Sequence, residues 1–379
     1  MIKRILYTLL IMFPVVASAQ INTDRVMAIG RNALYFEDYV LSIQYFNQVI
    51  NAKPYLSDPY FYRGLAKINL DDFQGAESDC SEAIERNPFV VSAYQVRGLA
   101  RIQQNNFAGA IEDYTKALEF DPENIGVWHN MALCRIRQED YKGAKNDLDK
   151  LIAISPRYTK AYLMRGEVDL KQKDTLAAEK DFGKAIEIDR YDADTWASRA
   201  ILRLQQQRYK DAEADFDHAI RLSTRNSGVY INRALARYHQ NNLRGAMSDY
   251  DIALDIDPNN FIGHYNRGLL RAQVGDDNRA IQDFNFVIEM EPDNMMAIFN
   301  RGLLLDQTGD YKGAIKDYST VINEYPNFLL GYQYRAQARR KIGDVKGADA
   351  DEFKVLKAQL DKQNGVDPNK QTADNTENN

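Results

Sequence analysis

The sequence predicts an all-α solenoid of about ten helix–turn–helix units. Residues 263–292 and 297–326 carry almost the same pattern of apolar, small and charged residues, 34 positions apart. The same step continues back to residue 29 and forward to residue 336 without an insertion or a deletion. Each unit contains two stretches with helical apolar periodicity and a short turn between them. Units of this length bury their apolar faces on their neighbours, so we expect regularly stacked pairs of helices.

Two positions of the unit hold only small residues. With residue 297 as position 3, position 8 is Gly or Ala in every unit, and position 20 is Ala in every unit but the first, which has Ser. Small side chains at these points let the two antiparallel helices of a unit approach closely. Position 8 is occupied by Gly30, Gly64, Gly98, Ala132, Gly166, Ala200, Ala234, Gly268, Gly302 and Ala336, and position 20 by Ser42, Ala76, Ala110, Ala144, Ala178, Ala212, Ala246, Ala280, Ala314 and Ala348.

Larger residues and prolines complete the pattern. Position 4 is mostly aromatic, and position 24 is mostly large and apolar, so these side chains can fill the space beside the small residues. Position 32 is Pro in most units, with Arg190 and Thr224 as exceptions, and a proline there ends one pair of helices before the next begins.

These columns resemble the signature of the tetratricopeptide repeat (TPR) family, whose 34-residue unit has small residues and a closing proline at these places. Ten units fit, over about residues 23–362. The resemblance implies a right-handed superhelix in which the first helices line a concave surface that binds peptides or proteins. The units differ from the commonest signature at position 7, where Arg replaces the usual Leu.

Arg at position 7 and Asp at position 23 form two further columns beside core positions. An unpaired charge there would be costly, whereas an Arg fork and a carboxylate satisfy each other. The first unit has Ile29 and Tyr45 and lacks both charges together, which favours pairing within a unit over pairing between units. Met131 interrupts the Arg column and leaves Asp147 without its own partner, and Arg135, one helical turn later, could replace it. The Arg column is Arg63, Arg97, Arg165, Arg199, Arg233, Arg267, Arg301 and Arg335, and the Asp column is Asp79, Asp113, Asp147, Asp181, Asp215, Asp249, Asp283, Asp317 and Asp351.

Composition limits the classes of partner and chemistry. The formal net charge of −6 argues against general binding to nucleic acid or to anionic membranes. Cys80 and Cys134 lie in units that should not touch, so we expect two buried thiols and no disulfide. The four histidines are scattered over different units, and the sequence contains no metal-binding spacing, nucleophile motif or cofactor motif. We therefore expect no metal, no cofactor and no enzymatic activity.

The two ends of the chain differ from the repeats. Residues 1–19 have two early cations, an apolar run and Ala-Ser-Ala before Gln20, which is the pattern of a secretory signal peptide. The run is too short for a membrane span, so we expect no membrane insertion after cleavage. The solenoid then covers residues 20–362. Residues 363–379 are polar and Asn-rich, and we expect them to be disordered.

Two features inside the solenoid are also expected to differ. The last unit, from about residue 329, has a polar second helix that should cap the stack. The junction at residues 223–228 is rich in turn-forming residues and could form a softer joint.

The resemblance also places ligand contacts on the first helices. Position 9 is apolar in nearly every unit and predicts an apolar stripe; partial burial by neighbouring helices is the alternative. Asn fills position 6 in three successive units and resembles the asparagine ladder by which some TPR proteins hold a peptide main chain, since an amide offers a donor and an acceptor. Solvated asparagines are the alternative. The candidate peptide-binding residues are Asn232, Asn266, Asn300, Leu235, Leu269, Leu303, Tyr238, Tyr265 and Phe299.

The function expected from these features is that of an exported, periplasmic or secreted scaffold that binds peptide or protein partners in the groove. The alternative is a self-assembling structural protein of the cell envelope, whose exposed end helices stack on another copy. A homo-oligomer is compatible with the first interpretation and required by the second, so a monomer at every concentration in light scattering would remove the second.

Overall fold

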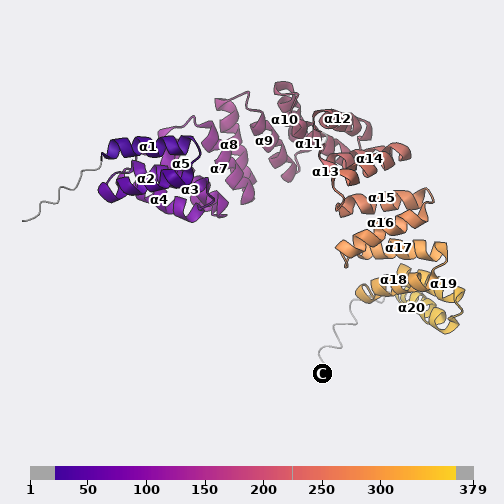
Figure 1. Ribbon diagram of the computed structural model, residues 1–379. Helices are drawn as coiled ribbons and strands as arrows, with labels where there is room; N and C mark the ends of the chain where they lie inside the picture. The colour runs from indigo at the N-terminus through magenta and orange to yellow at the C-terminus, as the bar shows by residue number, and fades with distance from the viewer. Residues whose placement is uncertain (1–21, 224, 364–379) are drawn as a thin grey trace, which may run out of the picture. The chain divides into compact units, whose positions relative to one another are not determined.

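The structure, a computed structural model, describes residues 22–223 and 225–363 (Figure 1). The expected signal peptide and Thr224 lie outside these residues, as does the expected disordered tail except for Gln363. Within the described ranges all regular secondary structure is helical, in twenty helices that pair as the repeat predicts. The chain forms two compact parts, which divide between Ile188 and Asp189. This division falls at a junction between repeats, one junction before the softer joint that the sequence suggests.

The first part contains five helical pairs. Each first helix packs on its own second helix, and each second helix packs on the first helix of the next pair. The helices are α1 (Thr23–Tyr35), α2 (Tyr39–Ala52), α3 (Asp58–Ile68), α4 (Phe73–Arg86), α5 (Val91–Gln103), α6 (Phe107–Phe120), α7 (Ile125–Arg137), α8 (Tyr141–Ile154), α9 (Thr159–Lys171) and α10 (Thr175–Ile188).

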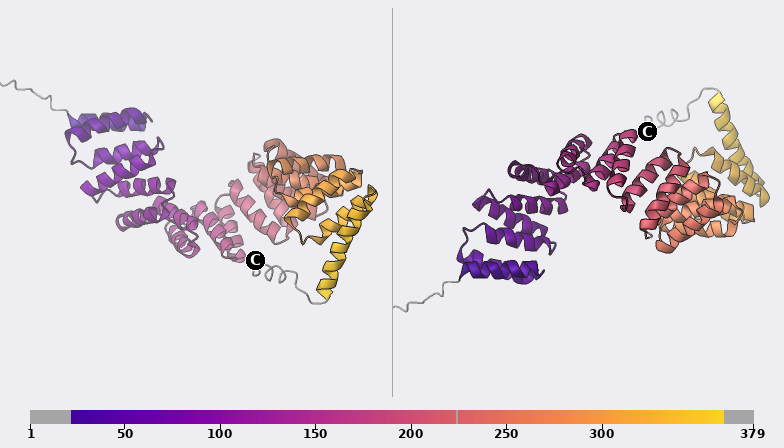
Figure 2. Two further views of the ribbon diagram at one scale, coloured as in Figure 1. Left: turned by 90° about the horizontal axis from the view of Figure 1, so that it is seen from below. Right: turned by 90° about the horizontal axis from the view of Figure 1, so that it is seen from above.

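The second part also contains five pairs, with the same order of packing. Figure 2 shows its last helix, α20, as the long yellow helix. The helices are α11 (Ala193–Gln205), α12 (Tyr209–Leu222), α13 (Ser227–His239), α14 (Leu243–Ile256), α15 (Phe261–Gln273), α16 (Asp277–Met290), α17 (Met295–Thr308), α18 (Tyr311–Glu324), α19 (Leu329–Lys341) and α20 (Val345–Gln363).

The small residues at position 8 make room for the large residue at position 24 of the same unit. A Cβ atom added to Gly98 would lie 2.8 Å from Cε1 of Tyr114, and one added to Gly166 would lie 2.6 Å from Cε1 of Phe182. Both rings are almost completely buried. The predicted close approach of the two helices is therefore confirmed. It requires a small residue at position 8, because the large side chain at position 24 fills the space beside it.

The turn inside each unit has one residue in the left-handed region. Position 15 has a φ between 58° and 92° in every unit, and only three of the ten residues there are glycine. Asp or Asn follows at position 16 in most units, and its side chain accepts a hydrogen bond from the backbone N–H three residues later, as Asp140 does from Gly143 at 3.0 Å. This contact caps the second helix and sets where it begins.

We expect replacement of Glu139 at position 15 by Gly to raise the free energy of unfolding by about 1 kcal/mol, because a left-handed conformation costs residues with a Cβ atom roughly that much. Urea denaturation of the purified protein measures the change. Gln138→Gly is the matched control, since Gln138 has a φ of −89° and gains nothing from glycine. An increase in stability for both variants, or for neither, would contradict this explanation.

The Arg and Asp columns pair within each unit, as predicted. Arg233 donates from Nε to Oδ2 of Asp249 at 3.0 Å and from Nη2 to Oδ1 at 2.6 Å, and seven other units repeat this two-point contact. The Asp side chains are buried. Met131 breaks the column, and Arg135 replaces the missing Arg by donating to Asp147 at 2.7 Å. The paired units are Arg63–Asp79, Arg97–Asp113, Arg165–Asp181, Arg199–Asp215, Arg233–Asp249, Arg267–Asp283, Arg301–Asp317 and Arg335–Asp351.

The same arginines also connect neighbouring units, which the sequence analysis did not foresee. Nη1 of Arg233 donates to Asp217 of the preceding unit at 2.7 Å, and Nη1 of Arg301 donates to Asn285 at 2.8 Å. Both acceptors are at position 25. Each of these guanidinium groups therefore joins its own second helix to the second helix of the unit before it, which fixes the register between similar helices.

A second cation at position 11 supports most of the buried carboxylates. Arg237 contacts Asp249 at 2.9 Å and also Glu213 at position 21 of the preceding unit, at 2.7 Å. In the fifth unit the signs are exchanged, since Asp169 occupies position 11 and pairs with Lys145 at position 21. The exchange preserves the ion pair between units, which indicates that the contact itself contributes to stacking.

The last helix has a mixed surface, which is less polar than the sequence expectation of a cap suggested. Val345, Phe353, Leu356 and Leu360 are all exposed on α20, and α20 has 19 residues where the other second helices have 14. Charged side chains such as Lys346 and Lys354 are exposed on the same helix, and Glu352 is paired with Arg340 at 2.7 Å. That α20 caps the stack stays a prediction.

Candidate functional site

The first helices of successive units form a continuous surface in each part of the chain. Helix α3 contacts both α1 and α5 in the first part, and α17 contacts both α15 and α19 in the second. Residues at positions 2, 5, 6 and 9 of the first helices contribute to this surface, and some rings at positions 5 and 6 also touch second helices, as Phe299 touches Tyr318. We call it the first-helix surface.

A pocket of about 250 Å³ opens on the first-helix surface between α5 and α7. Its lining residues come from positions 2, 3, 5, 6 and 9 of the first helices, together with the loop before α7 and one residue of α6. It combines apolar walls with three side-chain amides, which is the mixture typical of sites that bind peptides. The lining residues are Gln95, Val96, Leu99, Tyr114, Asn124, Gly126, Val127 and Asn130.

The hydroxyl group of Tyr114 is the unusual feature of this pocket. It is buried and has no hydrogen-bond partner among the described residues. Burial raises the pKa of this hydroxyl above its usual range, and the neighbouring Asn130 amide opposes the shift without completing a hydrogen bond. A buried hydroxyl without a partner costs free energy, and a water molecule or a ligand atom that reached it would remove this cost.

The site predicted from the sequence lies in later units, and the prediction did not connect Asn130 with Tyr114. A usable signal is present in the sequence: a Tyr at position 24 is followed sixteen residues later by an Asn at position 6. This combination occurs at Tyr114 and Asn130 and again at Tyr250 and Asn266. Burial raises the pKa of the Tyr250 hydroxyl as well.

The predicted peptide-binding residues of the second part lie on α13, α15 and α17. Leu269 is 40% exposed, whereas Leu235 and Leu303 are partly buried. Position 9 therefore forms an apolar stripe that neighbouring helices partly cover. Two of the predicted residues are bonded to each other, since the amide of Asn300 donates to the hydroxyl of Tyr265 at 3.1 Å. The remaining partly buried residues are Asn232, Asn266, Leu235, Leu303 and Tyr238.

Phe299 is a correction to the predicted set. It is only 8% exposed, and its ring makes edge contacts with Phe328 and Tyr334, with centroids 5.1 and 5.8 Å apart. The helical register directs position 5 toward the surface, but these aromatic neighbours in the next unit cover it. Phe299 therefore supports the core and offers little area to a ligand.

Comparison with known families agrees with this arrangement. Family models described as "TPR repeat" match residues 98–134, and models described as "Tetratricopeptide repeat" match residues 125–158, 159–192, 198–261 and 265–327. Together these matches cover more than half of the chain. The chain is a tetratricopeptide repeat protein. No curated protein matches its sequence.

Solved structures of similar fold are also TPR proteins or contain comparable arrays. A tetratricopeptide repeat protein from Parabacteroides merdae is 21% identical, with a TM-score of 0.51, over 66% of this chain and 98% of that one. A chain from the APC/C hetero-tetramer Cut9–Hcn1 is 13% identical, with a TM-score of 0.50, over 76% of this chain and 57% of that one. At these identities the likeness concerns the fold alone.

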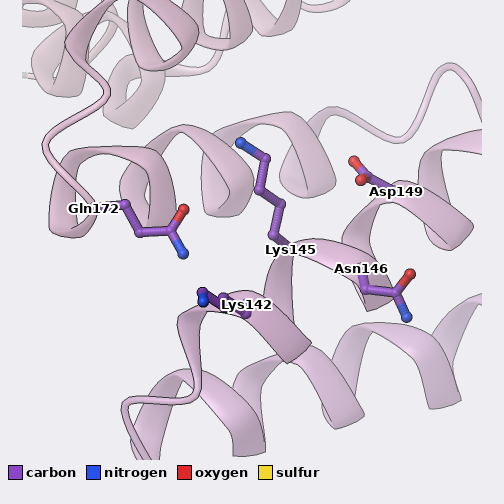
Figure 3. Close-up of a pocket in the computed structure, with 5 residues that line it drawn as sticks. All are labelled: Lys142, Lys145, Asn146, Asp149 and Gln172. Atoms are coloured by element: carbon purple, nitrogen blue, oxygen red, sulfur yellow. The ribbon is translucent and has the colours of Figure 1, made fainter.

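A second depression of the TPR protein lies on the second helices and is polar. Figure 3 shows four of its residues along α8 and one, Gln172, just after α9. Two of the charged groups already have partners, since Lys145 pairs with Asp169 and Asp149 accepts a hydrogen bond from Arg165 at 2.6 Å. This depression has no apolar side chain in its lining, unlike the pocket on the first-helix surface.

No group of three or more His, Cys, Asp or Glu side chains within residues 22–223 and 225–363 could hold a metal ion. None of the helices there is both long enough and apolar enough to cross a bilayer. Cys80 and Cys134 are buried and unbonded, as predicted, and burial raises their thiol pKa values to about 12 and about 11.

Proposed function

We propose that this TPR protein is an exported, non-enzymatic scaffold that binds extended peptide segments of partner proteins on its first-helix surface. The observation that carries the proposal is the pocket between α5 and α7, where the Tyr114 hydroxyl lacks a partner beside Asn130. TPR repeats are typical of proteins that present such surfaces. Export to the periplasm or the medium is proposed from the signal-like pattern of residues 1–19.

The pocket chemistry suits a peptide main chain with an apolar side chain. Gln95 and Asn130 each offer a donor and an acceptor, which matches the alternating groups of an extended backbone whatever its sequence. The third amide of the lining, Asn124, already caps α7 by accepting from the backbone N–H of Val127 at 3.1 Å. Val96 and Leu99 form an apolar wall, and Leu99 is 36% exposed. A rigid helical surface of this kind lowers the ordering cost of binding.

We expect peptides selected from a random library on the purified protein to bind at least about tenfold more weakly to the variants Asn130→Ala and Leu99→Glu, since removing one central contact costs about 1–2 kcal/mol. Isothermal titration measures the affinity. Lys116→Glu, on the exposed side of α6, is the matched control and should bind normally. Equal binding by all four proteins, or equal loss in the control, would overturn the assignment of this pocket.

The same selected peptides distinguish the pocket from the patch predicted in the second part. A variant with Asn232, Asn266 and Asn300 all changed to Ala removes three amides from α13, α15 and α17. If its affinity falls and that of Asn130→Ala does not, the ligand lies in the second part. If both fall, the peptide needs amides of both parts.

A further inference from the structure

The two ends of the repeat array expose large apolar side chains at the positions that internal units use to contact each other. Within each of the two parts, the second helix of one unit packs on the first helix of the next, and several of these junctions share the same pairs of positions. Position 28 packs near position 4, as Ile50 does in the cluster around Tyr60. Position 25 accepts a hydrogen bond from Arg at position 7, as Asn47 does from Arg63 at 2.6 Å.

A third pair joins the turn of one unit to the start of the second helix in the unit before it. The ring of His239 at position 13 stacks on Tyr209 at position 17, with centroids 4.6 Å apart. The amide of Gln240 at position 14 donates to the backbone carbonyl of the same Tyr209 at 3.4 Å. Positions 17, 25 and 28 therefore form the forward face of a unit, and positions 4, 7, 13 and 14 form its backward face.

The forward face of the last unit is open and apolar. Positions 17, 25 and 28 are Val345, Phe353 and Leu356, which are 53%, 66% and 54% exposed. At position 28 of internal units, Leu254 and Ile322 are 7% and 4% exposed, because the next unit covers them. Leu356 is therefore apolar like the residues at this position in internal units, but no following unit among the described residues covers it.

The backward face of the first unit is also open and apolar. Ile29 occupies position 7 and is 36% exposed, and Tyr35 and Phe36 at positions 13 and 14 are 81% and 76% exposed. Val26 at position 4 is partly buried. In the next nine units, position 7 is Arg or Met. The first unit therefore lacks the cation that every typical unit would bring to a junction.

The two open faces both have an apolar residue where internal junctions form a polar contact between positions 7 and 25. Position 25 is polar or small in the first nine units, and only the last unit has a large apolar residue there, Phe353. An Arg at position 7 would find no acceptor at Phe353, whereas Ile29 would pack on it. The internal register likewise places Val26 on Leu356 and Phe36 on Val345. The apolar pair at positions 7 and 25, Ile29 with Phe353, is available only when the first unit meets the last, whereas apolar pairs at positions 4 and 28 also occur at internal junctions.

We infer that the first unit of one molecule docks on α20 of a second molecule, in the position that an eleventh repeat would take. The contact is head-to-tail, so each molecule uses two different faces and can bind a neighbour at each end. The partner is a second copy of this chain because its first unit carries the apolar backward face that fits Phe353. This inference concerns the ends of the array and does not depend on the pocket between α5 and α7.

Crosslinking between two cysteine variants tests the arrangement. The purified variants Ile29→Cys and Phe353→Cys are mixed and treated with a short bismaleimide; the native Cys80 and Cys134 are buried and should not react. We expect a crosslinked dimer from the mixture and none from either variant alone. A dimer from one variant alone would show a symmetric contact and overturn the inference. A doubly substituted chain that crosslinks only within itself would also overturn it, because the occupant would then be the same molecule.

A second measurement follows the mass of the protein in solution. The weight-average mass should rise with concentration, and Leu356→Glu should abolish the rise. Leu176→Glu, which changes a leucine that is 83% exposed in the middle of the array, is the matched control and should leave the rise intact. Circular dichroism checks that both variants remain helical. A mass that stays at the monomer value for the unmodified protein at all concentrations would overturn the inference.

Discussion

Replacement of Arg301 by Ala should lower the free energy of unfolding by about 3 kcal/mol, because it leaves the buried carboxylate of Asp317 without its cation. Asp317 accepts two hydrogen bonds from Arg301, at 2.7 and 2.8 Å. Leu305 occupies position 11 of this unit, where most units place a second cation. The side chain of Asp317 is 4% exposed, so water cannot replace the lost partner.

The matched control is Arg233→Ala in another unit. Asp249 loses Arg233 in this variant but keeps Arg237, which contacts it at 2.9 Å. We therefore expect a smaller loss, about 1 kcal/mol. Denaturation in urea at constant pH compares the two variants. Equal losses, or a loss below about 0.5 kcal/mol for Arg301→Ala, would mean that the Arg and Asp columns behave as surface ion pairs.

The carboxyl group of Asp147 should make stability depend on pH in the opposite sense to an ordinary ion pair. Burial raises its pKa to about 6 despite the opposing effect of Arg135, because Met131 stands where other units have an Arg. Because this pKa is higher in the folded protein than in the unfolded chain, the protonated carboxyl of Asp147 stabilises the fold below about pH 4. This contribution is lost as the pH rises through 6. Relative to the variant Asp147→Asn, the unmodified protein should lose about 2 kcal/mol between pH 4 and 7.

Two further variants show whether the missing arginine is the cause. Asp283 has its Arg at position 7, and hydrogen bonds from His264 and Arg267 outweigh burial and lower its pKa. The difference between the unmodified protein and Asp283→Asn should therefore stay constant from pH 4 to 7. Met131→Arg should remove the pH dependence that Asp147 produces. Thermal unfolding midpoints across this pH range give the comparison, and a dependence that survives in Met131→Arg would contradict the explanation.

Much of the architecture follows from residues that recur in one register. Gly98 and Tyr114 show why: in most units a small residue at position 8 leaves room for a large one at position 24, so the pattern alone predicts close helical pairs. The pairing of Arg and Asp could be predicted because the first unit lacks both. The exchange of charges at Lys145 and Asp169 could not, because it requires knowing which side chains of different units meet.

The candidate site was harder to predict than the fold. Register indicates which way a position points, but exposure depends on the size of the neighbours, and the rings of Phe328 and Tyr334 bury Phe299. The orphaned hydroxyl of Tyr114 depends on the absence of a partner in three dimensions, which no spacing reveals. The apolar residues exposed on α20 were missed for a different reason: Glu352, Lys354 and Lys357 alternate with Phe353 and Leu356, so the segment has a polar composition.

The most direct test of the account asks which surface of the protein meets its partner in the producing cell. A photo-crosslinking amino acid is placed at Leu99 or Leu269 on the first helices, and at Lys116 or Lys184 on the second helices; all four side chains are exposed. The account predicts adducts with another protein from the two first-helix positions and none from the two second-helix positions. Adducts formed only from Lys116 and Lys184 would contradict it.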